Sequence, residues 1–300
     1  DFTKPTIMVP DDIIIEASDS LTSVNIGDAM ATDENGIISL SHNAPSSFPL
    51  GINTIIWTAI DGAGNMAIAS QIVTIQDTIP PQISPSDDIS LEAKSSSQNI
   101  VDIGIPSVTD DVGVYSITND APEVFPLGET IVTWTATDAS GNSASATQII
   151  SVIDTTSPVI EQPEDIIIEA VNHKENSISF ISPITTDIQD VTITNDAPEV
   201  FPLGETIVTW TATDTSGNIS TSEQEIHVID TTIPVITVPN DIQVEATSID
   251  ANTVEVGSAE ASDLVEISSI TNDAPKVFPL GETIVTWTAT DKFGNSSSSS

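Results

Sequence analysis

The sequence contains no cysteine and no arginine, and its only basic side chains besides histidine are five lysines. Without a thiol, neither a cysteine nucleophile nor a thiolate metal site is possible, and no disulfide can support the fold. Against the five lysines stand 45 Asp and Glu residues, which give a formal net charge of −40. Because nucleic-acid binding needs a basic surface, the sequence excludes nucleic acid as an expected partner.

Long apolar runs are also absent. Runs such as Ile13–Ile15 are far too short to cross a bilayer, so we expect no membrane insertion within this segment. The opening residues Asp-Phe-Thr-Lys-Pro lack the apolar core of a signal peptide, and we expect either a mature N-terminus or a piece of a longer chain. With 38% hydrophobic residues and abundant Ile, Val and Thr, the composition favours a folded, mainly β protein over disorder.

The four tryptophans reveal an internal repeat. Trp57, Trp134, Trp210 and Trp287 follow one another at intervals of 77, 76 and 77 residues. Each lies in a common segment that is best seen at Ile117–Asn142, ITNDAPEVFPLGETIVTWTATDASGN. The repeat predicts four domains, with the ranges 1–77, 78–153, 154–230 and 231–300.

The last copy is shorter than the others. The second copy ends in Ser143–Ile153, a predicted strand of eleven residues, whereas the fourth has only Ser296–Ser300 in that place. We therefore expect the C-terminal strand of the fourth repeat to be incomplete. Either the sequence is a fragment of a longer array, or a neighbouring molecule supplies the missing strand.

Within each repeat the hydrophobic period is two. In Thr130–Asp138 the side chains of Val132, Trp134 and Ala136 face one way and the threonines between them face the other. Such short strands, bounded by Pro, Gly, Asn and Asp and without helical periodicity, predict an all-β fold with an antiparallel two-sheet sandwich in each repeat. Four sandwiches joined by linkers without a Gly/Ser tract predict an elongated rod, well over about 100 Å long.

The repeated motif supports a family resemblance. The core ITNDAPxxFPLGxTxVTWTATDxSGN, with a DTTxPxI linker and an IxxEA strand before it, resembles the hyalin repeat (HYR) module, and the resemblance covers essentially the whole chain. It implies tandem immunoglobulin-like domains in an extracellular or cell-surface protein of adhesion or matrix assembly, and it implies no catalytic residues. The first copy departs most from the motif, at residues 42–48 and 60–65.

Carboxylates that return in every copy are the candidates for chemistry. Hard cations such as Ca²⁺ bind six to eight oxygens of carboxylates, amides and backbone, and the charge of −40 favours bound cations. If strands alternate in direction, Glu92 and Asp138 lie beside the linker residue Asp77, and Asp33 reaches this joint from the far end of the preceding repeat. Calcium is thus the one expected cofactor, and the predicted ligands between repeats are Asp77, Glu92, Asp138, Asn142, Asp154, Glu169, Asp214, Asp230, Glu245 and Asp291.

The same residues have structural interpretations. The segment Asp138–Asn142 is a favourable turn, and the Asp-Thr-Thr linkers form local side-chain to backbone bonds. The glutamates and the loop aspartates Asp33, Asp110, Asp187 and Asp263 fit a solvated surface equally well. Two sequons, at Asn218 and Asn295, permit glycosylation, which conflicts with cation ligation by the same side chains.

No phosphate-binding loop, nucleophile elbow or paired histidine motif occurs, and the polar residues recur in every copy, so we expect no enzyme. The prediction is a non-catalytic extracellular structural protein: a cell-surface stalk, a filament or a surface-layer (S-layer) subunit. It would associate with itself or with other surface proteins or glycans. Two alternatives remain: a ligand-binding adhesin with a recognition loop at 34–42 or 171–180, and accessory modules of a larger secreted enzyme.

Overall fold

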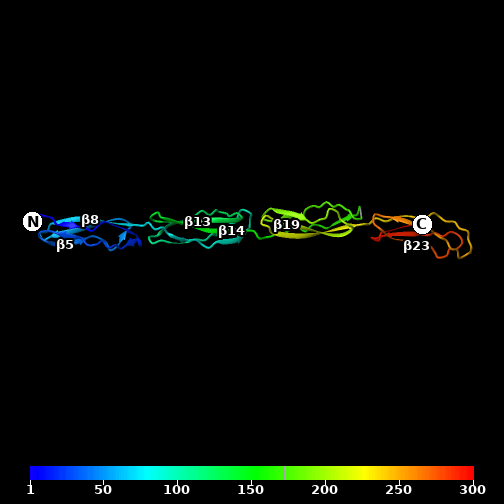
Figure 1. The fold of residues 1–300 in the computed structure, drawn as a ribbon, viewed down its shortest axis with the longest axis horizontal. Helices are drawn as coiled ribbons and strands as arrows, with labels where there is room; N and C mark the ends of the chain where they lie inside the picture. Colours follow the sequence, from blue (N-terminus) through cyan, green and yellow to red (C-terminus); the bar gives the residue numbers. More distant parts are fainter. Residues whose placement is uncertain (172) are drawn as a thin grey trace. The chain divides into compact units, whose positions relative to one another are not determined.

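The computed structural model describes residues 1–171 and 173–300, and over these residues the protein forms strands, turns and loops (Figure 1). Residue 172, in the segment 171–180 considered above, lies outside the described residues. No helix of the described part is long and apolar enough to span a membrane. The chain divides into two compact units, Asp1–Asp154 and Thr155–Ser300. Each holds two modules, for which we keep the predicted ranges as names.

The first unit contains fourteen strands. In the first module they are β1 (Thr6–Met8), β2 (Ile13–Glu16), β3 (Leu21–Thr22), β4 (Met30–Thr32), β5 (Ile37–His42), β6 (Phe48–Pro49), β7 (Gly51–Asp61) and β8 (Met66–Gln76). In the second module they are β9 (Gln82–Ser84), β10 (Ile89–Glu92), β11 (Ser107–Thr109), β12 (Val114–Asn119), β13 (Gly128–Asp138) and β14 (Ser143–Ile153).

The described residues of the second unit form eleven strands. The third module contains β15 (Val159–Ile160), β16 (Ile166–Glu169), β17 (Thr185–Thr186), β18 (Val191–Asn195), β19 (Gly204–Asp214) and β20 (Ile219–Ile229). The fourth contains β21 (Val235–Thr237), β22 (Glu260–Ser262), β23 (Ile267–Asn272), β24 (Trp287–Asp291) and β25 (Ser296–Ser299).

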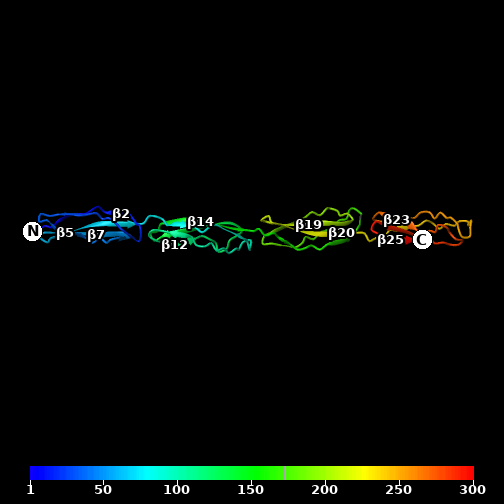
Figure 2. The same cartoon turned by 90° about the horizontal axis from the view of Figure 1, so that it is seen from below.

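Each module is a small sandwich, as the all-β, immunoglobulin-like prediction requires. In the second module a four-stranded sheet in the order β10-β14-β13-β12 accompanies the two-stranded sheet β11-β9, and Figure 2 shows β12 and β14 in this module. The predicted inward residues Val132, Trp134 and Ala136 are buried. Phe125 is buried with them, just before the turn in which Gly128 takes a positive φ of 99° and begins β13.

One feature of the sheet differs from the expected antiparallel pattern. Strand β10 pairs in parallel with β14, with Glu92 opposite Ile153, and β2–β8 and β16–β20 pair in the same way. The long central pair β13–β14 is antiparallel. Strand β10 therefore runs toward the end of the module where β14 finishes, opposite to the direction that alternating strands would give.

The fourth module has a smaller main sheet, β23-β24-β25. Its last strand β25 has four residues, compared with eleven in β14, as expected from the sequence. The segment 241–246, which corresponds to β10, forms no strand, and its residues Ile242 and Val244 are exposed. In the second module β10 pairs with Ile150–Ile153 of β14, and residues 1–300 contain no counterpart of this part of β14 in the fourth module.

Candidate metal centres

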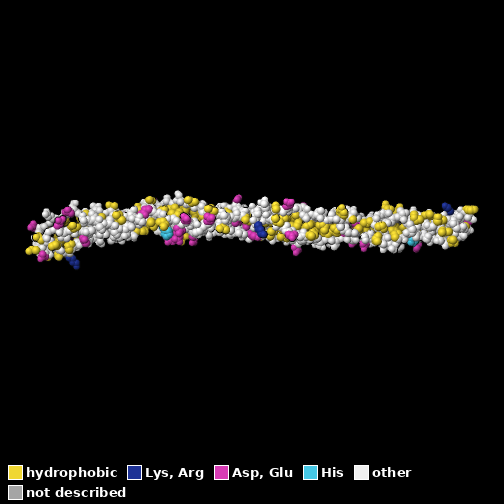
Figure 3. Space-filling model, turned by 180° about the vertical axis from the view of Figure 1, so that it is seen from behind, with side chains coloured by type: hydrophobic (Ala, Val, Ile, Leu, Met, Phe, Trp, Pro, Cys, Tyr) yellow, Lys and Arg dark blue, Asp and Glu magenta, His cyan; other side chains and the backbone are white. Residues whose placement is uncertain are grey.

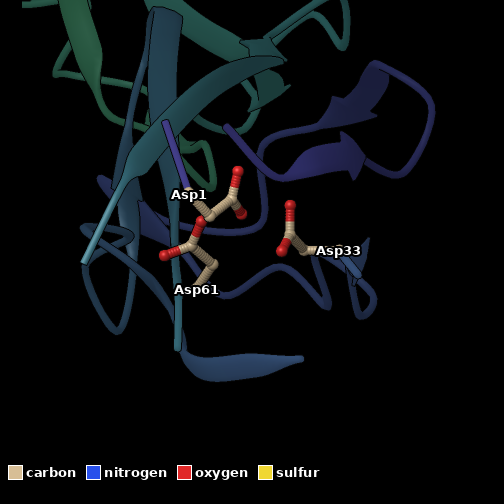
Figure 4. Close-up of side chains that lie close together, drawn as sticks. All are labelled: Asp1, Asp33 and Asp61. Carbon is tan, nitrogen blue, oxygen red and sulfur yellow. The ribbon is translucent and has the colours of Figure 1, made fainter. Parts of the chain in front are cut away.

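Three aspartates meet at the N-terminal end of the modules. One comes from the linker before the module, one from the loop after the first short sheet pair, and one from the end of the long central strand. In the second module these are Asp77, Asp110 and Asp138, each with a carboxylate oxygen within 4.8 Å of the others. The first module repeats the set as Asp1, Asp33 and Asp61, which Figure 4 shows gathered at one place, and the fourth module repeats it as Asp230, Asp263 and Asp291. In the third module Asp187 and Asp214 occupy the loop and strand positions, and Asp154 is the linker residue in the sequence.

The strand aspartate is fixed by the hairpin that it begins. Asp138 Oδ1 accepts hydrogen bonds from the backbone N–H groups of Ser140 and Asn142, both at 2.8 Å, and Oδ2 accepts one from Asn142 Nδ2 at 2.8 Å. This is the Asp turn expected from the sequence. Burial alone would raise the pKa of Asp138, but the hydrogen bonds from Asn142, Gly141 and Ser140 together hold the pKa below its ordinary value. The pKa values of Asp61, Asp214 and Asp291 are lowered for the same reasons. These carboxylates are charged at neutral pH.

The hairpin also holds the linker. Asn142 Nδ2 donates to the main-chain oxygen of Asp77 at 3.1 Å, and in the fourth module Asn295 Nδ2 donates to the oxygen of Asp230 at 2.9 Å. The loop aspartate has a local anchor of its own, because Asp110 Oδ1 accepts from Val112 N at 2.9 Å and Gly113 N at 2.8 Å. The loop and strand carboxylates are therefore held by backbone or amide donors, and the linker aspartate is held through its main-chain oxygen.

The linker aspartate leaves an oxygen unsatisfied. Asp230 is only 4% exposed; its Oδ1 accepts from Thr232 N and Thr232 Oγ1, while its Oδ2 is buried and has no hydrogen-bond partner among the described residues. Asp77 Oδ2 is likewise buried and has no hydrogen-bond partner among the described residues. An unpaired buried carboxylate oxygen is costly, and here it lies among two further carboxylates. A cation would satisfy this oxygen and offset the mutual repulsion of the set.

The first module differs at this point. Asp1 Oδ2 accepts a hydrogen bond from Asn35 Nδ2, and Asp1 Oδ1 accepts one from Thr3 N at 2.8 Å. Asn35 lies two residues after the loop aspartate Asp33, and in the second and fourth modules the residues at that position are Val112 and Val265. The side chain of valine has no donor, which explains why the linker oxygen is unsatisfied in these modules, whereas the Asn35 amide bonds it in the first.

The predicted ligands fall into two groups. The structure brings Asp77 together with Asp138 and Asn142, and Asp230 with Asp291. The expectation that Glu92 joins them is wrong, because β10 is parallel to β14 and carries Glu92 to the opposite end of the module. Glu169 is likewise opposite Ile229, and Glu245 lies outside any strand. The loop aspartates, interpreted as surface or as belonging to the preceding repeat, instead complete the set in their own module.

The strand glutamates have another role. Glu169 Oε1 accepts a hydrogen bond from Thr231 N at 2.8 Å, and Oε2 accepts one from Thr231 Oγ1 at 3.0 Å. Glu16 holds Thr78 through the same pair of bonds. Each of these threonines directly follows a linker aspartate. We call these glutamate–threonine pairs the linker clasps. A linker is thus held through its Asp by the module that follows and through its Thr by the module that precedes.

The sequon side chains belong to the same hairpins. Asn295 Nδ2 donates to Asp291 Oδ2 and to Asp230 O, both at 2.9 Å, and Asn218 Nδ2 donates to Asp214 Oδ2 at 2.8 Å. The amide nitrogen is the atom that a glycan would modify. Glycosylation of Asn218 and Asn295 stays a prediction, and this geometry disfavours it in the folded module.

Comparison with known proteins gives a consistent picture. The model of the HYR domain matches residues 76–152, 153–228 and 229–300. The chain is 34% identical to hyalin of Strongylocentrotus purpuratus, with 99% of the chain and 27% of that protein covered. It is 32% identical to hyalin of Lytechinus variegatus, with 95% of the chain and 58% of that protein covered. The chain thus spans about a quarter of the first protein and little more than half of the second.

Solved structures give a more distant likeness. The extracellular cadherin domains 3–6 of protocadherin gamma B2 match 98% of the chain over 97% of their own length, at 14% identity and a TM-score of 0.33. The extracellular domain of protocadherin gamma B4 matches with a TM-score of 0.35. The assignment of the fold rests on the strand pairing of the chain itself and not on these matches.

Proposed function

The chain belongs to the HYR domain family, and from this premise we propose that it is a non-catalytic structural protein of the extracellular, adhesion type. In this role the modules space or assemble other components at a cell surface, as a stalk, a filament or a surface-layer subunit. The relatives named hyalin support an extracellular, structural assignment.

One observation carries the proposal: the polar positions are the same in successive modules. The aspartate sets recur, and so do the hairpin bonds of Asp61, Asp138 and Asp291 to the asparagine four residues later. An enzyme needs one differentiated group of residues, whereas a load-bearing array needs equivalent units. Repetition at the most polar place of the module therefore favours a mechanical role over a catalytic one.

We extend the proposal to the joints, where Ca²⁺ would bind the aspartate sets. The donors are all oxygens, as Ca²⁺ prefers, and each set places three carboxylates within reach of a single ion. Asp77, Asp110 and Asp138 would hold the ion in the second module, and Asp230, Asp263 and Asp291 in the fourth. The unsatisfied Oδ2 atoms of Asp77 and Asp230 favour calcium binding in these two modules over the first, where Asn35 Nδ2 already donates a hydrogen bond to Asp1 Oδ2.

Calcium at these places would have a structural consequence. Because the linker aspartate is a ligand together with two residues of the following module, the ion would fix the linker to that module. The clasps Glu16–Thr78 and Glu169–Thr231 hold the same linkers from the other side. Cation binding is then expected to stiffen the connection between neighbouring modules and to raise their stability.

Thermal unfolding and small-angle scattering on the same sample test the proposal, in millimolar Ca²⁺ and then in chelator at matched ionic strength. A site at 100-fold saturation stabilises the folded state by about 2.7 kcal/mol, which small domains register as several degrees in Tm. We expect a higher Tm and a stiffer, extended particle in Ca²⁺. A compact particle under both conditions would contradict the structural role. An extended particle with an unchanged Tm would contradict calcium binding and leave the structural role intact.

A matched pair of variants locates the ion. Asp110→Asn should abolish the Ca²⁺-induced shift of the second module, whereas Asp111→Asn, one residue further and outside the set, should leave it intact. Equal effects of the two substitutions would mean that the ion binds through general surface charge.

A further inference from the structure

The outer face of the main sheet in the first module carries seven large apolar side chains, which we call the first-module outer face: Ile14, Ile52, Ile56, Ile60, Met66, Ile68 and Ile72. The uncharged polar side chains of Thr54, Thr58, Ser70 and Thr74 lie between them on the same side of the sheet. The apolar side chains come from three paired strands, with Ile14 and Ile52 on either side of Thr74 and with Ile60 opposite Met66. Ile52 is 76% exposed, Ile14 is 70% exposed and Ile68 is 59% exposed. The inward residues between them, such as Ile55 and Trp57, are buried, so this is the solvent side of the sheet.

The other modules carry polar residues at the same positions. The places of Ile52, Ile56 and Ile60 on β7 are taken by a glutamate and two threonines in every other module: Glu129, Thr133 and Thr137; Glu205, Thr209 and Thr213; Glu282, Thr286 and Thr290. Strands β13 and β19 nevertheless pair with their neighbours in the same register as β7. The module therefore folds with glutamate and threonine there, and the isoleucines of the first module are not needed for folding.

This face carries little charge in a highly acidic chain, and its carboxylates, Asp12 and Glu16, lie at the edge formed by β2. Asp12 Oδ1 accepts a hydrogen bond from Ile72 N at 2.7 Å. Strand β8 has no charged residue in its eleven positions, whereas the corresponding strand β20 has Glu223 and Glu225. On β7 the one charged residue is Asp61, which is buried. Glu16 of β2 is engaged by Thr78. Figure 3, in which the first module lies at the right, shows apolar side chains over this module with few acidic ones between them.

The net charge of −40 restricts what can cover such a face. Two copies of the chain repel one another wherever carboxylates meet, so stable self-contact requires a surface without them. A symmetric contact brings one face against the same face of the other copy, and here the centre of the contact is uncharged, with Asp12 and Glu16 at its edge. Apolar sheet faces pack well against each other at a separation of about 10 Å.

The size of the face suits a modest dimer. Two strands of eleven residues with their shorter neighbours cover roughly 500 Å², taking about 3.4 Å per residue and about 4.8 Å per strand. A symmetric pair would bury about 1,000 Å² in total, which is the size of weak, transient interfaces. Such an area fits reversible association of copies rather than a permanent complex.

We propose that the first-module outer face docks on the same face of a second copy of this chain. This contact is a surface through which the proposed structural array would assemble. It is independent of the cation sites, which lie at the module ends. It requires neither calcium nor the other three modules. Because the contact is apolar while the rest of the chain is acidic, added salt strengthens it by screening the repulsion.

Analytical ultracentrifugation of the chain tests the proposal, in chelator and over a range of NaCl. We expect a concentration-dependent dimer whose Kd falls as salt rises. Ile52→Glu gives the first module the residue that the other three carry, and it should raise the Kd at least tenfold with the fold unchanged by circular dichroism. Ile131→Thr, at an exposed isoleucine of the second module, is the matched control and should leave the Kd as it is.

Other results would overturn the proposal. A monomer at every concentration and salt, or a dimer unaffected by Ile52→Glu, would show that copies do not meet at this face. If the monomer instead sediments with neutral phosphatidylcholine vesicles, and Ile52→Glu abolishes this, the face binds lipid. Because the experiment is done in chelator and reads association alone, its failure leaves the extended structural array and its calcium sites to be judged by their own test.

Discussion

Trp134 Nε1 donates a hydrogen bond to Oε1 of Gln148 at 3.1 Å, inside the second module and across the β13–β14 pair. The same bond joins Trp57 to Gln71 and Trp210 to Gln224. Gln148 Nε2 also donates to the main-chain oxygen of Asp87 at 2.8 Å. One fully buried amide therefore satisfies the tryptophan and ties the loop before β10 to the central hairpin.

Replacing this glutamine should destabilise the second module. Gln148→Leu keeps the volume but leaves the buried Trp134 N–H without its partner, which costs about 1 to 3 kcal/mol. Urea unfolding followed by tryptophan fluorescence measures the change. Thr147→Val, at the exposed neighbouring position, is the control and should stay within about 0.5 kcal/mol of the parent. Equal losses in the two variants would mean that the hydrogen bond contributes nothing specific.

The hairpin aspartates predict a loss of stability in acid. The pKa of Asp138 is lower in the folded state than the ordinary value, so its contribution is present above about pH 4 and is lost as the pH falls through the lowered folded value. Unfolding midpoints between pH 7 and pH 2 in chelator measure this dependence. Asp138→Asn should be less stable than the parent at pH 7, and the difference should shrink in acid. With Glu123→Gln, at an exposed loop position, the pH profile should match that of the parent.

The unsatisfied oxygen of Asp77 predicts which residue controls cation affinity. Val112→Asn places in the second module the residue that caps Asp1 in the first, and its amide should occupy Asp77 Oδ2. Isothermal titration with Ca²⁺ should then show one site fewer, or a Kd at least tenfold weaker, for that module. Val112→Ala removes the same side chain without adding a donor and should still bind. Loss of binding in both variants would assign the effect to packing.

The linker clasps predict local protection of the linker. Glu16→Ala removes both acceptors of Thr78, whose amide should then exchange faster with solvent, by roughly fivefold for a bond worth about 1 kcal/mol at an exposed site. Hydrogen exchange of the Thr78 amide measures the change. The amide of Thr231, held by Glu169, is an internal control in the same sample. If Glu16→Ala changes Thr231 as much as Thr78, the effect is global and the clasp has no local role.

Much of the module could be predicted from the sequence, because its signals are local. The alternation around Trp134 correctly gave the inward residues, and the Asp138–Asn142 turn forms as its residue types indicate. The end at which Glu92 lies could not be predicted in this way. It depends on the pairing of β10 with β14, about 60 residues further along the chain, and nothing in the strand itself sets that direction.

Only part of the candidate site could be predicted, because some of its features depend on contacts between distant segments. Asp77 and Asp138 recur at fixed positions and were found, whereas Asp110 shows the same recurrence but its local turn with Val112 also explains it. The unsatisfied oxygen of Asp230 depends on burial by several segments at once, which no local pattern reveals. The repeat itself held a usable signal, since the position two residues after the loop aspartate is Asn35 in the first module, Gln189 in the third, and valine in the second and fourth.

The parallel pairing of β10 with β14 determines how a module responds to tension. A pull on its two linkers would draw β14 toward the C-terminal side and β10 toward the N-terminal side, so the pair is loaded along the strands. The hydrogen bonds of Ile89–Glu92 to Ile150–Ile153 would then have to break together, and not one after another as when a hairpin is opened from its end. Each module with this pair is therefore built to resist stretching.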